Sequence, residues 1–163
     1  MFGRKKKPEP KIVAPTVSNN LTKNDQKWGE LNRELEQSAV ARKWGFVRNC
    51  YLGMAQVLEK EKNHRQAVLQ YLIVSLYDAN GPHNWPGGDP ISPEMAAEFG
   101  IVDFDGKNEV LPGITGRLLN QADKAGMSIE DIKELYFLEA PRFHLAIMPH
   151  SVEECWERIA AAL

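Results

Sequence analysis

Residues 48–82, RNCYLGMAQVLEKEKNHRQAVLQYLIVSLYDANGP, carry two apolar patterns of helical period with a polar stretch between them. In the first half the apolar residues recur at i, i+3, i+4 and i+7, which is one face of an α-helix: Tyr51, Met54, Ala55 and Leu58. After polar residues 59–65 the pattern resumes with Ala67, Tyr71, Val74 and Leu76 or Tyr77. The stretch therefore predicts two antiparallel helices. The second should end near Asp78, because Asn80, Gly81 and Pro82 form a typical helix stop.

The apolar positions of this pair resemble those of a tetratricopeptide repeat, a two-helix unit of about 34 residues. The resemblance rests on Tyr51, Met54, Ala55, Leu58, Ala67 and Tyr71. Ala55 departs from the pattern, since the first helix usually carries Gly there, and Val74 replaces the closing Ala. A single unit cannot bury both of its faces, and no second copy precedes it at a spacing near 34 residues. We therefore expect a mostly α fold, a compact helical bundle around a tetratricopeptide-like antiparallel pair.

Length and composition fit one globular domain. The chain has 163 residues, of which 43% are hydrophobic and 26% charged, close to the average of soluble proteins. We expect one helical domain over residues 24–163. It would consist of N-terminal helices in 24–80, a Gly/Pro loop in 81–91 and C-terminal helices in 92–163. The longest apolar run, residues 71–77, is too short to span a membrane.

The chain has two cysteines, Cys50 and Cys155, each within a predicted amphipathic helix. Such placement favours buried free thiols in a reducing compartment over a disulfide framework. We therefore expect a cytoplasmic protein.

Start and stop signals place the other helices. Asn24 or Asp25 can cap a helix whose apolar stripe includes Trp28, and a break is expected near residues 43–46, where Gly45 weakens a helix by about 1 kcal/mol relative to Ala. Further helices are expected to begin at Ser92 and at Pro112. Two capping boxes are expected, Ser128 with Asp131 and Ser151 with Glu154, and Pro141 is expected to end the helix between them.

Residues 101–111, IVDFDGKNEVL, alternate apolar and acidic residues around a central Asp-Gly pair and are the only candidate β-hairpin. A calcium loop is the other interpretation, since four oxygen-bearing side chains cluster there. It fails at both ends, because Ile101 occupies the first ligand position and Pro112 stands where the closing Glu belongs.

His83 and Trp85 stand out in the loop of residues 81–90, GPHNWPGGDP. One interpretation is a binding loop that presents an imidazole and an indole to a partner. The favoured one is a compact loop whose Trp85 folds back onto the helix pair, because an indole left in water is costly.

The N-terminal tail, residues 1–23, differs in charge from the rest. Six basic residues against one acidic residue give it a net charge of +5, which leaves −7 for the other residues of a chain whose total is −2. Three prolines favour an extended chain, and no apolar segment typical of a secretory signal follows. The tail is either a flexible solvated terminus, which we favour, or an arm that contacts nucleic acid or another anionic surface. The residues that would make that contact are Arg4, Lys5, Lys6, Lys7 and Lys11.

His144, His150 and Cys155 invite a metal or nucleophile hypothesis. The sequence contains none of the usual spacings, neither a His-x3-His or Cys-x2-Cys pair nor a Gly-x-Ser-x-Gly elbow. Gly-rich phosphate loops are missing too. We therefore predict no metal, no cofactor and no catalytic residue.

Four further segments look similar to short bacterial, phage and prophage proteins of unassigned function: residues 77–82 (YDANGP), 112–117 (PGITGR), 141–144 (PRFH) and the Ser151 to Trp156 stretch, together with the basic N-terminus. The resemblance implies a cellular setting and no activity.

The first hypothesis for function is a non-catalytic adaptor that binds another protein. In a tetratricopeptide-like unit the first helix exposes the face opposite its packing stripe, which here would present Asn49, Leu52, Gln56 and Lys60, with His83 and Trp85 from the neighbouring loop. The alternative is a nucleic-acid-associated protein that uses the basic tail. An enzyme without a recognisable motif comes third.

Overall fold

The computed structural model describes residues 21–82, 85, 94 and 112–163. Within these residues the chain forms six α-helices and no strand: α1 (Lys23–Val40), α2 (Trp44–Lys60), α3 (His64–Asn80), α5 (Pro112–Lys124), α6 (Ile129–Phe143) and α7 (Val152–Ala162). The expected mostly helical bundle is confirmed. The candidate hairpin of residues 101–111 and the helix expected from Ser92 lie outside the described residues.

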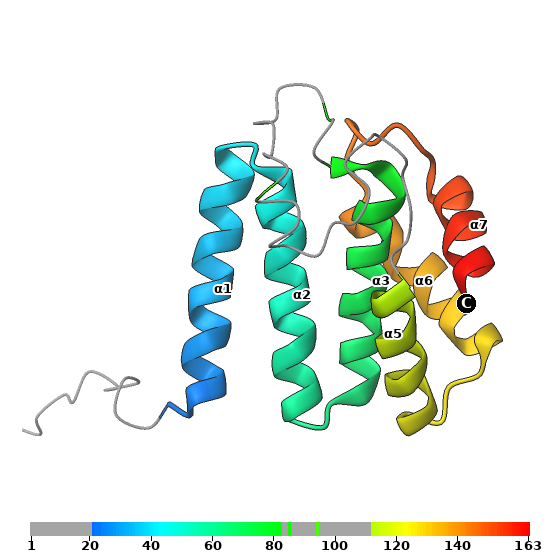
Figure 1. The fold of residues 1–163 in the computed structure, drawn as a ribbon, viewed down its shortest axis with the longest axis horizontal. Coiled ribbons are helices and arrows are strands. Elements are labelled where there is room, and N and C mark those ends of the chain that lie inside the picture. The colour runs from blue at the N-terminus through cyan, green and yellow to red at the C-terminus, as the bar shows by residue number, and fades with distance from the viewer. Residues whose placement is uncertain (1–20, 83–84, 86–93, 95–111) are drawn as a thin grey trace, which may run out of the picture.

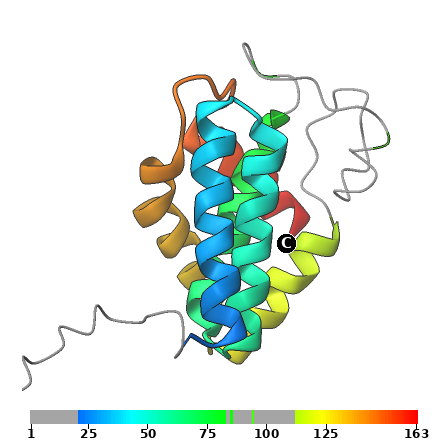
Figure 2. The same cartoon turned by 90° about the vertical axis from the view of Figure 1, so that its left-hand side faces the viewer.

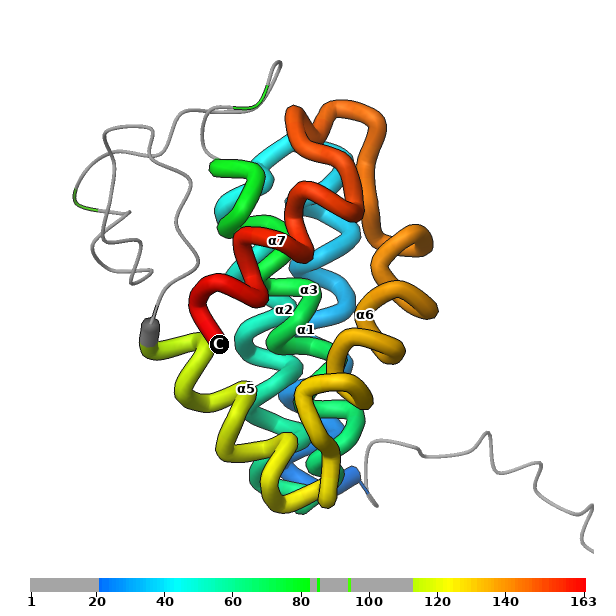
Figure 3. Tube along the Cα trace, turned by 90° about the vertical axis from the view of Figure 1, so that its right-hand side faces the viewer, coloured from blue at the N-terminus to red at the C-terminus, as the bar shows by residue number. Residues whose placement is uncertain are grey.

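Helix α3 is the centre of the bundle. Figure 1 shows α1, α2 and α3 side by side, and α5, α6 and α7 pack against α3. Figure 3, from the opposite side to Figure 2, shows α5, α6 and α7 around it. Every residue from 71 to 80 is buried, so α3 has no solvent-exposed face along its C-terminal half.

Helix α1 is peripheral. It packs mainly on α2, as Figure 2 shows from the side of these two helices. Only Leu31 and Ser38 of α1 are buried. Leu31 forms a small apolar cluster with Met54 and Val57 of α2, and half-buried Trp28 packs against this cluster. A methyl group on Gly53 would lie 2.8 Å from a Leu31 methyl carbon, so glycine permits the close approach.

The same three-residue turn joins α1 to α2 and α2 to α3. Its middle residue is left-handed in both, Arg42 with φ 56° and Lys62 with φ 58°. The next residue follows at φ −89°, ψ 74° for Lys43 and φ −88°, ψ 72° for Asn63. The amide of each donates to the carbonyl five residues back, at 2.8 and 2.9 Å. The first break thus falls at residues 41–43, slightly earlier than expected.

Gly45, on which the break was predicted, lies in the first turn of α2 and is buried. Helix α2 tolerates Gly45 in its first turn, because the break between α1 and α2 is made by the turn at residues 41–43. The helix propensity of one glycine is small beside the packing of the whole of α2.

Two helix ends differ from the expectation. The N-cap of α1 is Thr22 rather than Asn24 or Asp25, because Asp25 serves as the third helical residue of a capping box, with reciprocal bonds of 3.1 Å. Helix α3 continues to Asn80 rather than ending near Asp78. Gly81, left-handed at φ 60°, terminates it.

The capping box of Ser128 and Asp131 is confirmed. Pro141 does not end α6, which runs on to Phe143. Proline removes only its own amide, and later amides still bond, such as that of His144 to the Ala140 carbonyl at 2.9 Å.

Helix α7 has half of the expected capping box. Ser151 accepts from the Glu154 amide at 3.1 Å, but the Glu154 carboxylate binds the ring of His150 at 3.0 Å instead of the Ser151 amide. Trp156 and Ile159 lie on the apolar face of α7 and are buried.

The core joins α2, α3, α5, α6 and α7 into one apolar cluster. Leu138 of α6 is 68% exposed, whereas Phe137 beside it packs against the core. None of the helices in the described residues has the length and apolar composition to cross a membrane.

Candidate interaction surface

A buried ion pair ties α2 to α3. The guanidinium of Arg48 donates from Nε and Nη2 to the two carboxylate oxygens of Asp78, at 2.9 and 3.0 Å. The Arg48 side chain is fully buried and that of Asp78 is 6% exposed. A fork of two parallel bonds fixes the register of the helices as well as neutralising the charges. The ion pair of Arg48 and Asp78 was not predicted from the sequence, although both are charged residues within apolar helix faces.

A second polar contact ties the other end of the pair. The hydroxyl of Tyr71 donates to Glu59 at 2.6 Å, and Arg117 of α5 donates to the same hydroxyl at 3.5 Å. Burial, and next the Glu59 hydrogen bond, raise the pKa of Tyr71 to about 12. Next to them, His64 Nδ1 lies 2.7 Å from Gln121 Oε1. These contacts lock α2, α3 and α5 together.

The predicted face of α2 remains partly open. Asn49, Leu52 and Gln56 are half-buried and Lys60 is exposed. Leu52 packs against the core cluster, so it contributes less open surface than the sequence suggested. Within the residues that the structure describes, the side chains of Asn49, Gln56 and Lys60 make no hydrogen bond and no ion pair.

Trp85 belongs to the core. It is 4% exposed, its indole Nε1 donates to the Asn80 carbonyl at 2.7 Å, and its ring lies 5.3 Å from that of Tyr77 and 5.6 Å from that of Trp44. The favoured interpretation, an indole that folds back onto the helices, is therefore the observed one. His83 lies outside the described residues.

Asn80 holds together segments far apart in the sequence. Its amide nitrogen donates to the Leu76 carbonyl at 2.8 Å and lies 3.1 Å from Cys155 Sγ, and its Oδ1 accepts from the His150 amide at 2.9 Å. The side chain is 1% exposed. Asn80 therefore connects the end of α3 to the start of α7.

The Cys155, His150 and His144 group is structural in its geometry. His144 Nε2 lies 2.8 Å from the His150 carbonyl, and the His150 ring bonds Glu154 rather than the thiol. Burial raises the pKa of Cys155 to about 11, which disfavours the thiolate that a nucleophile requires. Among the described residues no group of three or more His, Cys, Asp and Glu could hold a metal ion.

Both cysteines are buried free thiols, as expected. Burial, with a smaller contribution from Glu34, also raises the pKa of Cys50 to about 11.

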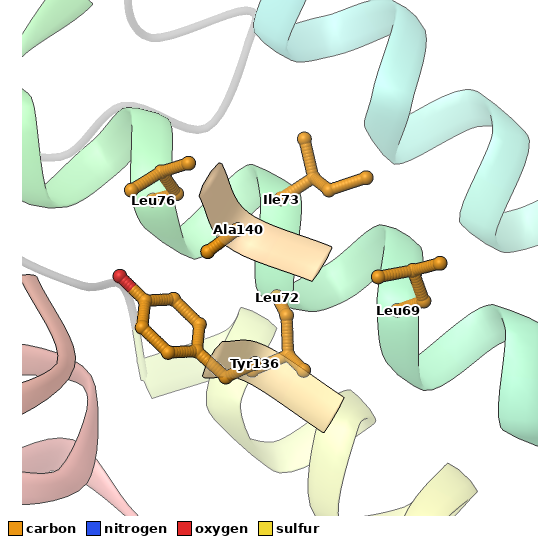
Figure 4. A pocket seen from close by; sticks show the side chains of 6 residues that line it. All are labelled: Leu69, Leu72, Ile73, Leu76, Tyr136 and Ala140. Atoms are coloured by element: carbon orange, nitrogen blue, oxygen red, sulfur yellow. The ribbon is translucent and has the colours of Figure 1, made fainter. Parts of the chain in front are cut away.

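Helices α3 and α6 leave a small apolar space between them (Figure 4), lined by Leu69, Leu72, Ile73, Leu76, Tyr136 and Ala140. Its volume is about 10 Å³, no more than the smallest space that holds one water molecule. We interpret it as a packing defect rather than a ligand site.

A larger groove, open to solvent, lies where the α1–α2 turn meets the segment that joins α6 to α7. It has a volume of about 330 Å³, and we call it the end groove. Figures 2 and 3 show the two segments at the same end of the bundle. Its lining residues come from both: Ala39, Arg42, Trp44, Leu145, Ala146 and Ile147. No sequence pattern pointed to it, because the two segments are about a hundred residues apart.

The basic residues of the tail, Arg4, Lys5, Lys6, Lys7 and Lys11, lie outside the described residues. Comparisons of the chain with protein-family models, with curated proteins and with solved structures give no match. The class defined by the described residues is therefore a helical bundle centred on one helix, α3.

Proposed function

We propose that the protein is a non-catalytic adaptor that binds another protein through the outer face of α2. The observation that carries this proposal is the row of Asn49, Gln56 and Lys60, which are half-buried or exposed and whose side chains make no polar contact within the described part of the chain. Amide side chains offer both donors and acceptors, which suits the backbone of an extended peptide. Leu52 in the same row adds an apolar contact.

The helix that carries this row, α2, is fixed by contacts on two sides. Helix α2 is tied to α3 at Arg48 and at Glu59, and α1 packs on its other side. Binding to a preformed face loses less conformational entropy than binding to a loop. On this proposal the α2–α3 pair acts as a tetratricopeptide-like unit. The buried free thiols suit a reducing compartment such as the cytoplasm, and a phage or prophage setting is part of the same proposal.

Charge changes on this face test the proposal. We expect the double variant Gln56→Arg, Lys60→Glu to lose a protein that wild type retains in affinity capture from the native host. The matched control is Gln26→Arg, Lys27→Glu, which makes the same substitutions at two exposed positions of α1. The control should retain the partner. Equal recovery by both double variants would remove α2 as the binding face.

The alternative function, association with nucleic acid, is favoured by the charge asymmetry between the tail, at +5, and the remaining chain, at −7. It predicts DNA binding that weakens with salt and disappears when residues 1–11 are deleted. Neither double variant should affect such binding. Absence of DNA binding at low salt would eliminate this alternative.

A further inference from the structure

The two walls of the end groove are held in place by contacts with the core. The Met148 amide donates to the Leu145 carbonyl at 2.9 Å, and Met148 itself is 7% exposed, which anchors this wall in the core. His144 Nε2 lies 2.8 Å from the His150 carbonyl. This contact joins the two ends of the segment between α6 and α7. On the opposite wall, the Trp44 ring packs at 5.6 Å from the ring of buried Trp85.

Among the residues that the structure describes, the lining combines an apolar surface with a single cation. Five of the six lining residues are apolar. Two apolar side chains remain partly in water at this end, Ile147 at 36% and Val40, next to lining residue Ala39, at 87% exposure. Arg42 is the exception. Arg42 lines the groove, and its guanidinium makes no hydrogen bond or ion pair within the described residues.

The neighbouring cation does not share this position. The ammonium of Lys43 lies 5.8 Å from the centre of the Phe46 ring, which is a cation–π contact on α2. Arg42 is therefore the guanidinium available to an anion in the groove, and guanidinium binds carboxylate with two parallel hydrogen bonds.

The size of the groove favours a small ligand. A volume of about 330 Å³ is at the lower end of the roughly 300–1,000 Å³ found for small-molecule sites. Six lining residues are far fewer than the roughly 20–30 that each partner contributes to a stable protein interface. The basic N-terminal tail is a poor occupant, because its charge has the same sign as that of Arg42.

We propose that the end groove binds a small apolar carboxylate, with its carboxylate on Arg42 and its apolar body between Trp44 and Ile147. This site is separate from the α2 face, so its failure would leave the adaptor proposal intact.

The test is a titration of the full chain with octanoate, below the concentration at which octanoate forms micelles, followed by methyl NMR. We expect saturable shifts in the methyl signals of Ala39, Leu145, Ala146 and Ile147. Octylammonium has the same chain length and the opposite charge, and we expect it to bind at least about tenfold more weakly, because it places a cation beside Arg42. Equal binding of the two probes, or shifts spread over the whole surface, would overturn the proposal.

Two variants at equivalent positions sharpen the result. Arg42→Asn should weaken octanoate binding by about tenfold or more, the size expected for loss of a charge-assisted hydrogen bond. Lys62→Asn removes a cation from the same left-handed position of the other turn and should leave binding unchanged; asparagine tolerates that conformation. An unchanged affinity in Arg42→Asn would contradict the role of the guanidinium.

A further probe distinguishes a protein partner. An acetylated Leu-Leu dipeptide with a free carboxylate that saturates the same methyl signals at a lower concentration than octanoate would overturn the assignment to a small ligand. The ligand of the groove would then be the C-terminus of a peptide.

Discussion

The α1–α2 and α2–α3 contacts use the same turn and differ in what they bury. Arg42 and Lys62 occupy equivalent left-handed positions, so the backbone enters both helix pairs in the same way. The α2–α3 contact then contains a buried ion pair and one side of the common core. The α1–α2 contact buries a small cluster around Leu31. Turn geometry therefore sets how two helices meet, while burial decides how firmly they are held.

The sides of α2 that face α3 and α1 are occupied by packing contacts. The side toward α3 is closed by Arg48 and Glu59. The side toward α1 is covered by a helix that has few other contacts. Asn49, Gln56 and Lys60 keep part or all of their surface exposed between these contacts, which is why we propose partner binding there.

The largest expected effect comes from breaking the ion pair. Arg48→Met should destabilise the fold by about 3–5 kcal/mol, because it leaves the Asp78 carboxylate buried without its partner. The double variant Arg48→Met, Asp78→Leu should recover most of this loss, since an apolar pair of similar volume is tolerated. Urea unfolding measures both. A single variant as stable as wild type would show that the pair does not hold α2 to α3.

Truncation of one leucine in each contact compares the two directly. Leu72→Ala, in the core around α3, should cost about 3–5 kcal/mol, and Leu31→Ala, in the α1 cluster, about 2 kcal/mol, because a peripheral helix can move to fill the cavity. Both leucines are buried, at 2% and 5% exposure, so accessibility alone predicts no such difference. Equal losses in urea unfolding would contradict the distinction.

Alkaline pH should weaken both contacts, in two pH ranges. Burial raises the pKa of Cys50, on the α1 side of α2, to about 11, and that of Tyr71 in α3 to about 12. Each group is neutral when protonated and has a higher pKa folded than unfolded. Its contribution to the free energy of unfolding is therefore complete below the pKa of the unfolded state. That contribution decreases as the pH rises toward the pKa of the folded state. The ranges are about pH 9–11 for Cys50 and about pH 10–12 for Tyr71.

Each group contributes on the order of 2–3 kcal/mol at most. Cys50→Ala should reduce the pH dependence of stability between about pH 9 and 11, where Cys155 also titrates, and Tyr71→Phe should reduce it above that range, both measured as the free energy of unfolding against pH. Stability that stays constant from pH 9 to 12 would show that neither group is buried as described.

The smallest effect tests the shared turn. Arg42→Gly and Lys62→Gly should each stabilise the protein by about 0.5–1 kcal/mol, because glycine adopts a left-handed conformation without the clash of a Cβ atom. The two gains should be equal within error in thermal unfolding. A gain at only one position would mean that the turns are not equivalent.

Local chemistry explains which features the sequence predicted. The periodicity around Met54 and Tyr71 located both central helices, and Ser128 with Asp131 located the start of α6, since such signals act over three or four residues. Pairings between distant positions left no pattern. In the sequence, Arg48 and Asp78 are isolated charged residues 30 positions apart. Only the packing of α2 on α3 brings them into contact.

The end groove was missed for the same reason, because Arg42 and Ile147 meet only in the folded chain. The end of α6 shows a third limit. Pro141 is a helix breaker by propensity, but it removes only its own amide, and α6 runs on to Phe143.

Native-state hydrogen exchange tests most directly whether α3 is the centre of the fold and α1 its outer layer. Amides of α3 from Tyr71 to Asn80 should exchange only through global unfolding, with a free energy equal to that from urea unfolding. Amides in the middle of α1, around Leu31, should exchange through a local opening whose free energy is measurably lower. Equal protection in α1 and α3 would contradict the division between a central pair and a peripheral helix.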